Sequence, residues 1–240
     1  MEQRMIAILS GDKELLGVFE REEDTHRRFA ALAYKKKPED ITKEERSKAK
    51  SVLFGSNYGQ SAATLADNFG LELREAEYLM DQYFTVFPEM TKWREEVYRE
   101  SVRKHILTTL FGRHRRFVGY KFLQSSYAQS ILKKFEIKLA LNNMRNMAYN
   151  FKVQSTSSDY LSIATYNLYK EFRERGLKSR IIMSIHDAIN LKVYNLELDI
   201  VKELLEKYME KEVTIGNHSV QLKVDIKVGK RWEELEEIKT

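Results

Sequence analysis

The 240-residue sequence contains no cysteine, which excludes disulfide bonds, thiolate zinc sites and a cysteine nucleophile. It contains only two prolines, so neither a collagen-like nor a proline-rich disordered chain is expected. No apolar run approaches the roughly 18 residues that a membrane-spanning helix needs. The apolar stretch 5–9 is too short for the core of a signal peptide. We therefore expect no membrane partner.

An excess of charge of one sign is also lacking. Lysine and arginine total 41 against 36 aspartates and glutamates, which gives a net charge of +5. This mild basic bias permits a nucleic-acid partner without requiring one. Hydrophobic residues make up 42 % of the chain, enough for a substantial core, and the length allows one large domain or two small ones.

The first two thirds of the chain are predicted to be mainly helical. Helices are expected over 12–21, 24–34, 73–87, 89–104, 124–148 and 159–175. A further helix is predicted to begin near Thr42, because the sequence from Thr42 to Glu45 fits a capping box. Pro88 separates two of these helices, since proline ends a helix that precedes it.

The composition changes after residue 176. Runs at 179–185 and 188–193 are rich in strand-forming residues and flank His186 and Asp187, which predicts a tight hairpin. A helix over 196–211 follows. Segments 213–215 and 219–228 then predict a second hairpin, and apolar residues alternate with polar ones along the last strand. The expected fold class is α+β, with helices packed on a small antiparallel sheet.

One predicted helix combines cations and aromatics at a fixed spacing. Arg46, Lys50, Phe54 and Tyr58 recur every four residues, so they share one slowly rotating helix face. The spacing alone leaves two interpretations open. The face is either a solvated basic stripe that runs into two core aromatics, or a nucleotide platform. In a platform the cations hold phosphates and the aromatics stack on a base or sugar.

The residue pattern of this segment resembles a known sequence motif. RSKAKSVLFGSNYG at 46–59 resembles motif B of the family A, or DNA polymerase I-like, DNA polymerases. That motif reads Arg, three residues, Lys, three residues, Phe or Tyr, Gly, two residues, Tyr-Gly. Collinear similarities extend to about Trp232: MEQRMIAILSGD at 1–12 (downstream part of motif A), DTH at 24–26, LFGR at 110–113, NFKVQSTSSD at 150–159, IHDA at 185–188 (motif C) and VDIKVGKRW at 224–232.

The resemblance implies the C-terminal portion of a template-directed DNA polymerase. Residues 1–12 would be a remnant of the motif A palm strand, 13–110 the helical fingers, and 111–240 the C-terminal palm. Deoxynucleotides would be added to a primer 3′ end by nucleotidyl transfer that uses two Mg²⁺ ions. The implied partners are primer–template DNA and dNTPs. The implied location is cytoplasmic, at the nucleoid or in a phage-infected cell.

The resemblance also implies roles for the residues that carry the chemistry. Asp187 matches the catalytic, metal-binding aspartate of motif C. Arg46 and Lys50 match catalytic groups, and with His26 they match the groups that hold the incoming triphosphate, where charge develops during transfer. Without the resemblance, Asp187 would be an ordinary turn former.

Further residues match positions that contact nucleotide or DNA. Phe54 matches a position near the sugar of the incoming nucleotide, and Tyr58 matches a residue that stacks beside the template base. Glu2 matches a glutamate that blocks a ribose 2′-OH. The implied DNA contacts are Tyr58, Arg113, Asn150, Gln154 and His186. For Glu2, Arg113, Asn150, Gln154 and His186, a solvated surface, helix-cap or turn position is the alternative.

The sequence departs from the family pattern in two ways. Met1 and Glu2 align with the end of Asp-Tyr-Ser-Gln-Ile-Glu, so the metal-binding aspartate of motif A and the thumb would precede Met1. We therefore expect the isolated chain to be nearly inactive and to need an N-terminal polymerase polypeptide that carries both. This portion is either a separate subunit or the preceding part of one longer chain, and Met1 fits both alternatives equally well. In addition, Ala188 replaces the usual Glu of motif C. Both departures also fit a non-catalytic, polymerase-derived nucleic-acid-binding protein. Smaller departures are Asn146, Lys152 and Ser155, where Arg, Pro and Gly are common.

Overall fold

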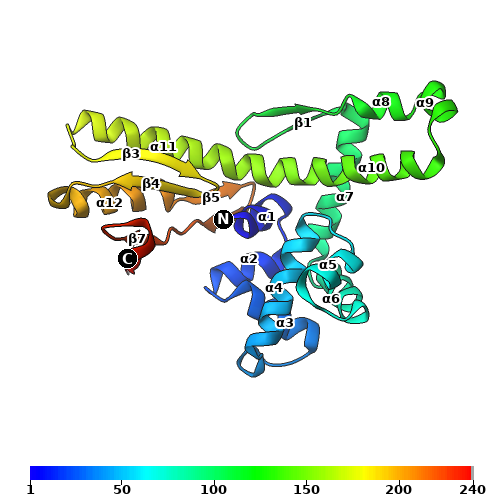
Figure 1. Cartoon of the computed structure of the whole chain (residues 1–240), viewed down its shortest axis with the longest axis horizontal. Coiled ribbons are helices and arrows are strands. Elements are labelled where there is room, and N and C mark those ends of the chain that lie inside the picture. The colour runs from blue at the N-terminus through cyan, green and yellow to red at the C-terminus, as the bar shows by residue number, and fades with distance from the viewer. Residues whose placement is uncertain (239–240) are drawn as a thin grey trace. The chain divides into compact units, whose positions relative to one another are not determined.

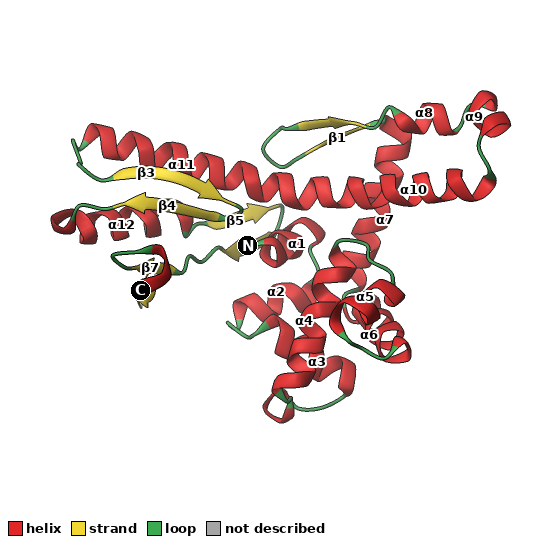
Figure 2. Ribbon diagram, viewed as in Figure 1, coloured by secondary structure: helices red, strands yellow, loops and turns green. Residues whose placement is uncertain are grey.

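The computed structural model of the chain describes residues 1–238. It contains two compact units, one of residues 2–156 and one of Met1 with the residues from Ser157 onward. Helices dominate, and the strands form short antiparallel pairs (Figure 1, Figure 2). The expected α+β class is confirmed. None of the helices within residues 1–238 is long and apolar enough to span a membrane.

The unit of residues 2–156 is mainly helical. Its elements are α1 (Glu2–Ser10), α2 (Lys13–Glu20), α3 (Thr25–Tyr34), the 3₁₀-helix η1 (Pro38–Asp40), α4 (Lys43–Asn57), α5 (Ala62–Phe69), α6 (Leu73–Val86), α7 (Pro88–Lys104), β1 (Ile106–Thr108), β2 (His114–Arg116), α8 (Gly119–Leu123), α9 (Ser126–Ile131), α10 (Lys134–Asn150) and the π-helix η2 (Phe151–Ser155).

Side-chain caps fix where the important helices begin. The predicted capping box of α4 is confirmed: the Thr42 hydroxyl accepts a hydrogen bond from the Glu45 amide at 3.1 Å, and the Glu45 carboxylate accepts one from the Thr42 amide at 3.0 Å. Lys36 and these bonds lower the pKa of Glu45 to about 2. Pro88 occupies the first turn of α7, where its missing N–H costs nothing.

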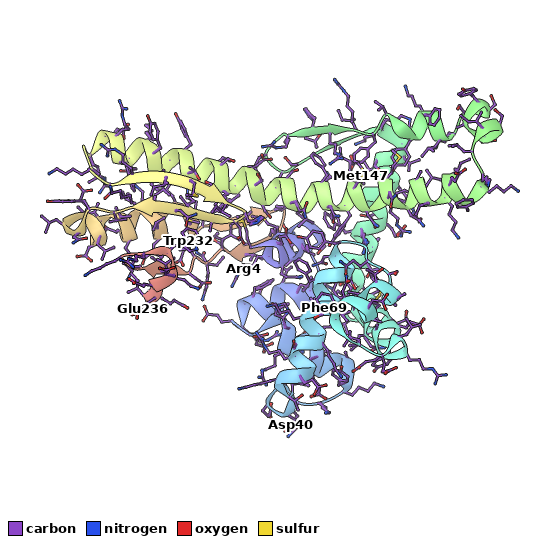
Figure 3. The ribbon with its side chains drawn as sticks, viewed as in Figure 1. Arg4, Asp40, Phe69, Met147, Trp232 and Glu236 are labelled. Atoms are coloured by element: carbon purple, nitrogen blue, oxygen red, sulfur yellow. The ribbon has the colours of Figure 1, made fainter. Side chains whose placement is uncertain are left out.

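A buried carboxylate ties two helix starts together. One oxygen of Asp12 accepts a hydrogen bond from the Leu15 amide at the start of α2, and the other accepts one from the Met90 amide at the start of α7. Asp12 is fully buried, and burial raises its pKa despite these bonds. Beside it, Arg4 of α1 (Figure 3) lies 4.5 Å from the ring centroid of Phe19 in α2. These contacts hold α1, α2 and α7 to one another.

Two helix predictions in this unit need correction. Residues 1–12 were expected to hold a strand remnant, but Glu2–Ser10 is the helix α1. Its consecutive residues Met5 to Ile8 are all buried, and a helix satisfies its own backbone groups while burying every side. The single helix expected over 124–148 is two helices, α9 and α10. The break comes before Lys134, because the Lys133 amide donates instead to the Glu136 carboxylate at 2.7 Å.

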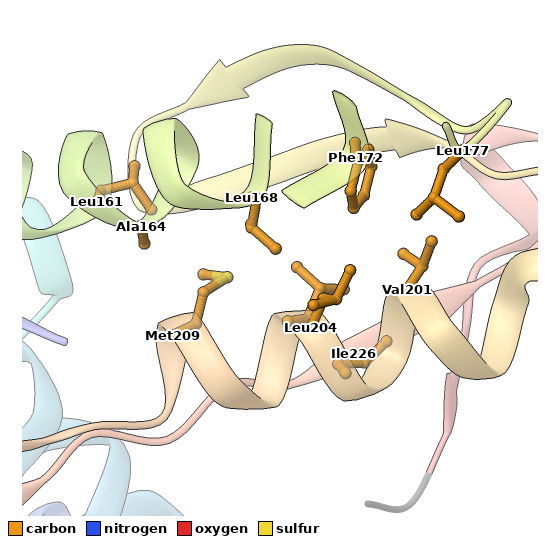
Figure 4. Packing of buried hydrophobic residues seen from close by; sticks show 10 residues of the cluster. Leu161, Ala164, Leu168, Phe172, Leu177, Val201, Leu204, Met209 and Ile226 are labelled. Carbon is orange, nitrogen blue, oxygen red and sulfur yellow. The ribbon is translucent and has the colours of Figure 1, made fainter. Parts of the chain in front are cut away.

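The second unit packs two helices around one core. Its elements are α11 (Thr156–Glu174), which begins in the last residue of the first unit, β3 (Arg180–Ile185), β4 (Ala188–Lys192), the 3₁₀-helix η3 (Asn195–Glu197), α12 (Leu198–Met209), β5 (Glu212–Ile215), β6 (His218–Gln221), β7 (Ile226–Val228), the 3₁₀-helix η4 (Trp232–Glu234) and β8 (Glu236–Ile238). Figure 4 shows Leu168 and Phe172 of α11 facing Leu204 of α12.

Both predicted hairpins of this unit are confirmed, with one change. Strands β3 and β4 pair antiparallel around His186 and Asp187, and β5 pairs β6. The long last strand expected over 219–228 is interrupted, and β7 pairs β8 instead. The cause lies in the backbone between them, because the Leu222 amide donates to the Lys211 carbonyl and the Val224 amide donates to the Glu210 carboxylate. The boundary expected at 110/111 between fingers and palm stays a prediction.

We expect Leu168→Ala to destabilise the second unit by about 3 kcal/mol, because it leaves a cavity where a fully buried side chain stood. Urea-induced unfolding followed by circular dichroism measures the loss. The matched control is Leu196→Ala, at a leucine that is 83 % exposed and should lose less than about 0.5 kcal/mol. Equal losses in the two variants would contradict the assignment of this core.

Candidate nucleotide and nucleic-acid interface

The aromatic end of the α4 face is open to solvent. Phe54 is 54 % exposed, and its ring centroid lies 4.8 Å from that of the half-buried Tyr58. The interpretation of both residues as core aromatics is therefore wrong. Lys50 is exposed and has no ion-pair partner within residues 1–238. An exposed cation next to an exposed aromatic pair is an arrangement that can hold a phosphate beside a base or sugar.

Arg46, one turn before Lys50, is fixed by a carboxylate of a neighbouring helix. One oxygen of Asp24 accepts hydrogen bonds from Nε of Arg46 at 2.9 Å and from Nη2 at 2.5 Å. The other oxygen accepts from the Arg27 amide and so caps the start of α3. Burial raises the pKa of Asp24, but the bonds from Arg46 and the Arg27 amide outweigh it and lower the pKa. The start of α3 and the basic face of α4 are thereby held together.

His26 lies in the first turn of α3, close to the same charges. Its Nδ1 atom is buried and has no hydrogen-bond partner in the described chain. Burial lowers the pKa of His26, and the positive charges of Arg46 and Lys50 lower it further against the opposing charge of Asp24. The structure thus brings the three predicted triphosphate-binding residues into one electrostatic neighbourhood. An anion there would meet two cations and the positive end of α3.

Two other predicted residues meet across a long stretch of sequence. The hydroxyl of Tyr58 donates to both carboxylate oxygens of Glu2, at 2.9 and 2.8 Å. Glu2 lies in the first turn of α1, and Tyr58 is the C-cap residue of α4. Glu2 is therefore not a solvated residue at a loose chain start. Its bond to Tyr58 fixes the carboxylate beside the aromatic end of the α4 face.

The predicted duplex contacts of this unit lie on neighbouring elements. Arg113 is exposed in the turn between β1 and β2. Asn150 ends α10 and Gln154 is exposed in η2. Lys152 lies between them and donates to the Thr108 carbonyl of β1 at 2.7 Å, and burial lowers its pKa. This bond holds the hairpin against the helix that carries Asn150 and Gln154.

His186 and Asp187 belong to the other unit, where they form the exposed turn of the β3–β4 hairpin. His186 has a φ of 53°, a left-handed conformation that is unfavourable for a residue with a Cβ. The pairing of β3 and β4 also shifts register between Ile181 and Met183, which marks a β-bulge. Bulges and strained turns are common next to functional sites. How close Asp187 comes to the α4 face stays a prediction.

Asp187 fits the role of a single ligand to a hard cation. Its carboxylate is exposed at a turn, and Mg²⁺ is held by one or two carboxylates together with water and substrate phosphates. Residues 1–238 contain no group of three or more His, Asp or Glu side chains arranged to hold a metal ion. The described residues therefore do not assemble a metal site around Asp187 by themselves.

Sequence reasoning missed a buried group behind the α4 face. Arg94 of α7 donates to the Ser56 carbonyl at 2.9 Å and to Oδ1 of Asn146 at 3.3 Å. The Asn146 amide in turn donates to the Gly59 carbonyl at 3.3 Å. These residues line a cleft of about 440 Å³. No local sequence pattern indicates that Arg94 is buried, because it lies among other charged residues in a helix whose sequence is typical of an exposed one. Of these residues, the sequence pattern identifies only Asn146, as a departure from the arginine that is common there.

The first unit thus presents a helix face with cations and aromatic rings, and the second an exposed carboxylate at the turn of a β-hairpin. Comparison with known proteins defines the class to which the chain belongs. The family model of DNA polymerase family A matches residues 1–234, so the chain belongs to that family.

Individual relatives support this. The chain is 32 % identical over 235 residues to DNA polymerase I of Lactococcus lactis and 30 % identical over 232 residues to the thermostable DNA polymerase I of Thermus thermophilus. These matches cover 98 % and 97 % of the chain but 25 % and 26 % of the relatives, so the chain spans about a quarter of their length.

A solved structure is also similar: the POL domain of Pol1 from M. smegmatis in complex with DNA primer-template and dNTP. It has a TM-score of 0.77 and 26 % identity, and the match covers 92 % of this chain and 36 % of that one.

The lowered pKa of His26 predicts a pH dependence of stability. The folded pKa lies below the unfolded value of 6.5, so the unfolded chain binds more protons between the two values. The free energy of unfolding should therefore rise with pH across that window, level off above it, and be lost as pH falls. His26→Gln should flatten this part of the profile, measured by urea unfolding from about pH 5 to 7.5. The control is His218→Gln in the exposed β5–β6 hairpin. An unchanged profile in His26→Gln would contradict the burial of the imidazole.

Proposed function

We propose that this chain supplies the fingers and C-terminal palm of a template-directed DNA polymerase, which adds deoxynucleotides to a primer 3′ end. The observation that carries the proposal is the grouping of Arg46, Lys50 and His26 on α3 and α4, next to the exposed Phe54 and the Glu2–Tyr58 pair. Family membership and the likeness to a polymerase domain with bound primer-template and dNTP support it.

The triphosphate of the incoming nucleotide would bind along the basic face. Arg46 uses Nε and Nη2 for Asp24, so its remaining N–H groups are available for a phosphate. Lys50 would add a second cation one turn further on, and His26 a neutral donor or acceptor. Negative charge grows on the leaving pyrophosphate during transfer, and these groups would stabilise it there.

The base and sugar would bind at the aromatic end of the same face. Phe54 would pack near the sugar, and Tyr58 would stack beside the template base. The Glu2 carboxylate, fixed by the Tyr58 hydroxyl, would occupy the space of a ribose 2′-OH and so favour deoxynucleotides. Arg113, Asn150, Gln154 and His186 would contact the duplex.

Asp187 would hold Mg²⁺ from the tip of the β3–β4 hairpin. Two such ions would activate the primer 3′-OH and stabilise the leaving group. Because the described chain offers one carboxylate for this site, we propose that a second aspartate, and the thumb, come from outside residues 1–240. In the described residues β3 pairs only with β4, so an edge of this hairpin is available for a strand that carries the aspartate. That strand would belong to an N-terminal polymerase polypeptide.

A second candidate is a non-catalytic nucleic-acid-binding protein derived from a polymerase. Ala188 favours it, because the alanine beside Asp187 removes a carboxylate from the neighbourhood of the metals. The nearly intact basic face of α4 favours the polymerase, since DNA binding alone does not need a triphosphate site.

Replacing Lys50 and Asp187, one at a time, should separate nucleotide use and primer extension from DNA binding. Lys50→Ala should impair nucleotide use on the order of a hundredfold while leaving DNA affinity within about twofold, because the lysine contacts a phosphate of the nucleotide. Asp187→Ala should abolish primer extension with DNA affinity retained. Steady-state kinetics of the chain mixed with an N-terminal portion that carries the thumb and the motif A aspartate, and fluorescence anisotropy with a labelled primer–template, measure the two effects. A Lys50→Ala protein with normal nucleotide use would contradict the assignment of α4.

Primer extension with Mg²⁺ and four dNTPs tests the need for a second polypeptide. We expect no extension by the purified chain alone and extension when an N-terminal portion with the thumb and the motif A aspartate is added. Extension by the chain alone would mean that another carboxylate completes the metal site. Absence of extension from the mixture, with DNA binding retained, would favour the non-catalytic candidate.

A further inference from the structure

Arg94 is an unusual residue, because its guanidinium is buried without a carboxylate to balance its charge. The residue is 9 % exposed and forms no ion pair with any carboxylate in residues 1–238. A buried charge is costly unless its hydrogen bonds are satisfied. The arginine next to this cleft, Arg145, differs in this respect, because it pairs with Glu95. The burial of the Arg94 charge must therefore be explained by the neutral groups that contact it.

Those partners all belong to the end of α4 or to the residues that touch it. Nη1 donates to the Ser56 carbonyl in the last turn of α4, a carbonyl that also accepts from the Gly59 amide at 3.2 Å. Nη2 donates to Asn146, whose amide donates to the Gly59 carbonyl. The carbonyls at a helix C-terminus lack partners within the helix. Arg94 and Asn146 supply these partners from α7 and α10.

Aromatic rings hold the guanidinium in this position. Its central carbon lies 4.8 Å from the ring centroid of Tyr149 and 5.6 Å from that of Phe84. Such stacking partly replaces the lost hydration of the cation. Burial also raises the pKa of Tyr149, so this ring stays neutral beside Arg94.

The turn that follows α4 packs directly on this network. Gly59 has a φ of +73°, and a Cβ at this position would overlap the side chain of Asn146. The position of Gly59, and of Tyr58 before it, is therefore set by Asn146 and by Arg94 behind it. Arg94 also lowers the pKa of Arg145, after burial, so positive charge is already concentrated here.

We propose that Arg94 is a positioning residue that fixes the C-terminal end of α4, and with it Tyr58 and Gly59. It does so in place of the arginine that the family pattern has at position 146. The functional consequence, correct placement of Tyr58 and Glu2 around the incoming nucleotide, rests on the proposed polymerase function. The placement itself does not, since it follows from the contacts of Arg94.

Amide hydrogen exchange of the full chain tests the placement without reference to activity. The amides of Tyr58, Gly59 and Gln60 are hydrogen-bonded to carbonyls in the last turn of α4 and should be protected. Arg94→Met removes both donors but keeps an unbranched side chain beside Tyr149. We expect these three amides to exchange on the order of tenfold faster, as for loss of a charged donor to a buried carbonyl. Amides of the first turns of α4 should be unchanged.

Relocating the arginine is the decisive variant. Asn146→Arg alone should also speed exchange at these amides, because it crowds a second guanidinium against Arg94. The double variant Arg94→Met/Asn146→Arg should restore protection to within about twofold of the original chain. The control is Arg173→Met, which removes an exposed arginine stacked on Tyr169 of α11. Unchanged protection in Arg94→Met, or a double variant no better protected than Arg94→Met, would overturn the proposal.

Arg94→Lys covers the case in which Arg94→Met does not fold. Lysine keeps the charge, but its single compact ammonium lacks the planar fork with which Arg94 reaches the Ser56 carbonyl and Asn146 from two different nitrogens. Local loss of protection at Tyr58 to Gln60 with an unchanged unfolding midpoint supports the proposal, and normal protection overturns it.

Calorimetric measurement of dNTP binding to each variant tests the functional consequence of this placement. We expect Arg94→Met to bind several-fold more weakly and the double variant to recover. If Lys50→Ala binds as tightly as the original chain, the proposed function fails, while the exchange data still decide the role of Arg94.

Discussion

The ends of buried helices set the main constraint on this structure. A helix leaves backbone groups unpaired at both termini, and these groups are costly where water cannot reach them. Asp12 accepts hydrogen bonds from amides at the starts of both α2 and α7, and Asp24 caps α3 while it also binds Arg46. Arg94 donates to the Ser56 carbonyl in the last turn of α4, and Asn146 donates to the Gly59 carbonyl in the turn that follows. The same charged side chains that satisfy helix ends therefore also fix where the functional side chains lie.

This double use of the same side chains explains which groups the α4 face presents. The C-terminal end of the helix is held by α7 and α10, through the hydrogen bonds of Arg94 and Asn146. The face itself presents Lys50 and Phe54 to solvent. Negative charge is kept at the edge of this face, where Asp24 leaves part of the Arg46 guanidinium available. Under the proposed function, this face would bind the incoming nucleotide with little reorganisation, because rigid supports would keep the cations in place before the ligand arrives.

The second unit contributes chemistry of another kind. Its core between α11 and α12 is ordinary and apolar, and it supports a hairpin whose turn carries Asp187 next to His186, which has an unfavourable backbone conformation. An exposed carboxylate on a strained turn binds little by itself. Its value depends on the groups that meet it, and the chain spans only about a quarter of the length of its relatives.

Local sequence patterns predict the helices with strong caps, both C-terminal hairpins, and the family. Capping at Thr42 and the spacing of Arg46, Lys50, Phe54 and Tyr58 depend on neighbours a few residues away, so they can be recognised from the sequence. Long-range contacts, in contrast, establish that Glu2–Ser10 is a helix, that 219–228 is interrupted, and that Glu2 meets Tyr58. They also establish that Arg94 lies beneath the end of α4. These features depend on partners tens of residues away, and no local pattern records which distant backbone group a buried side chain will satisfy.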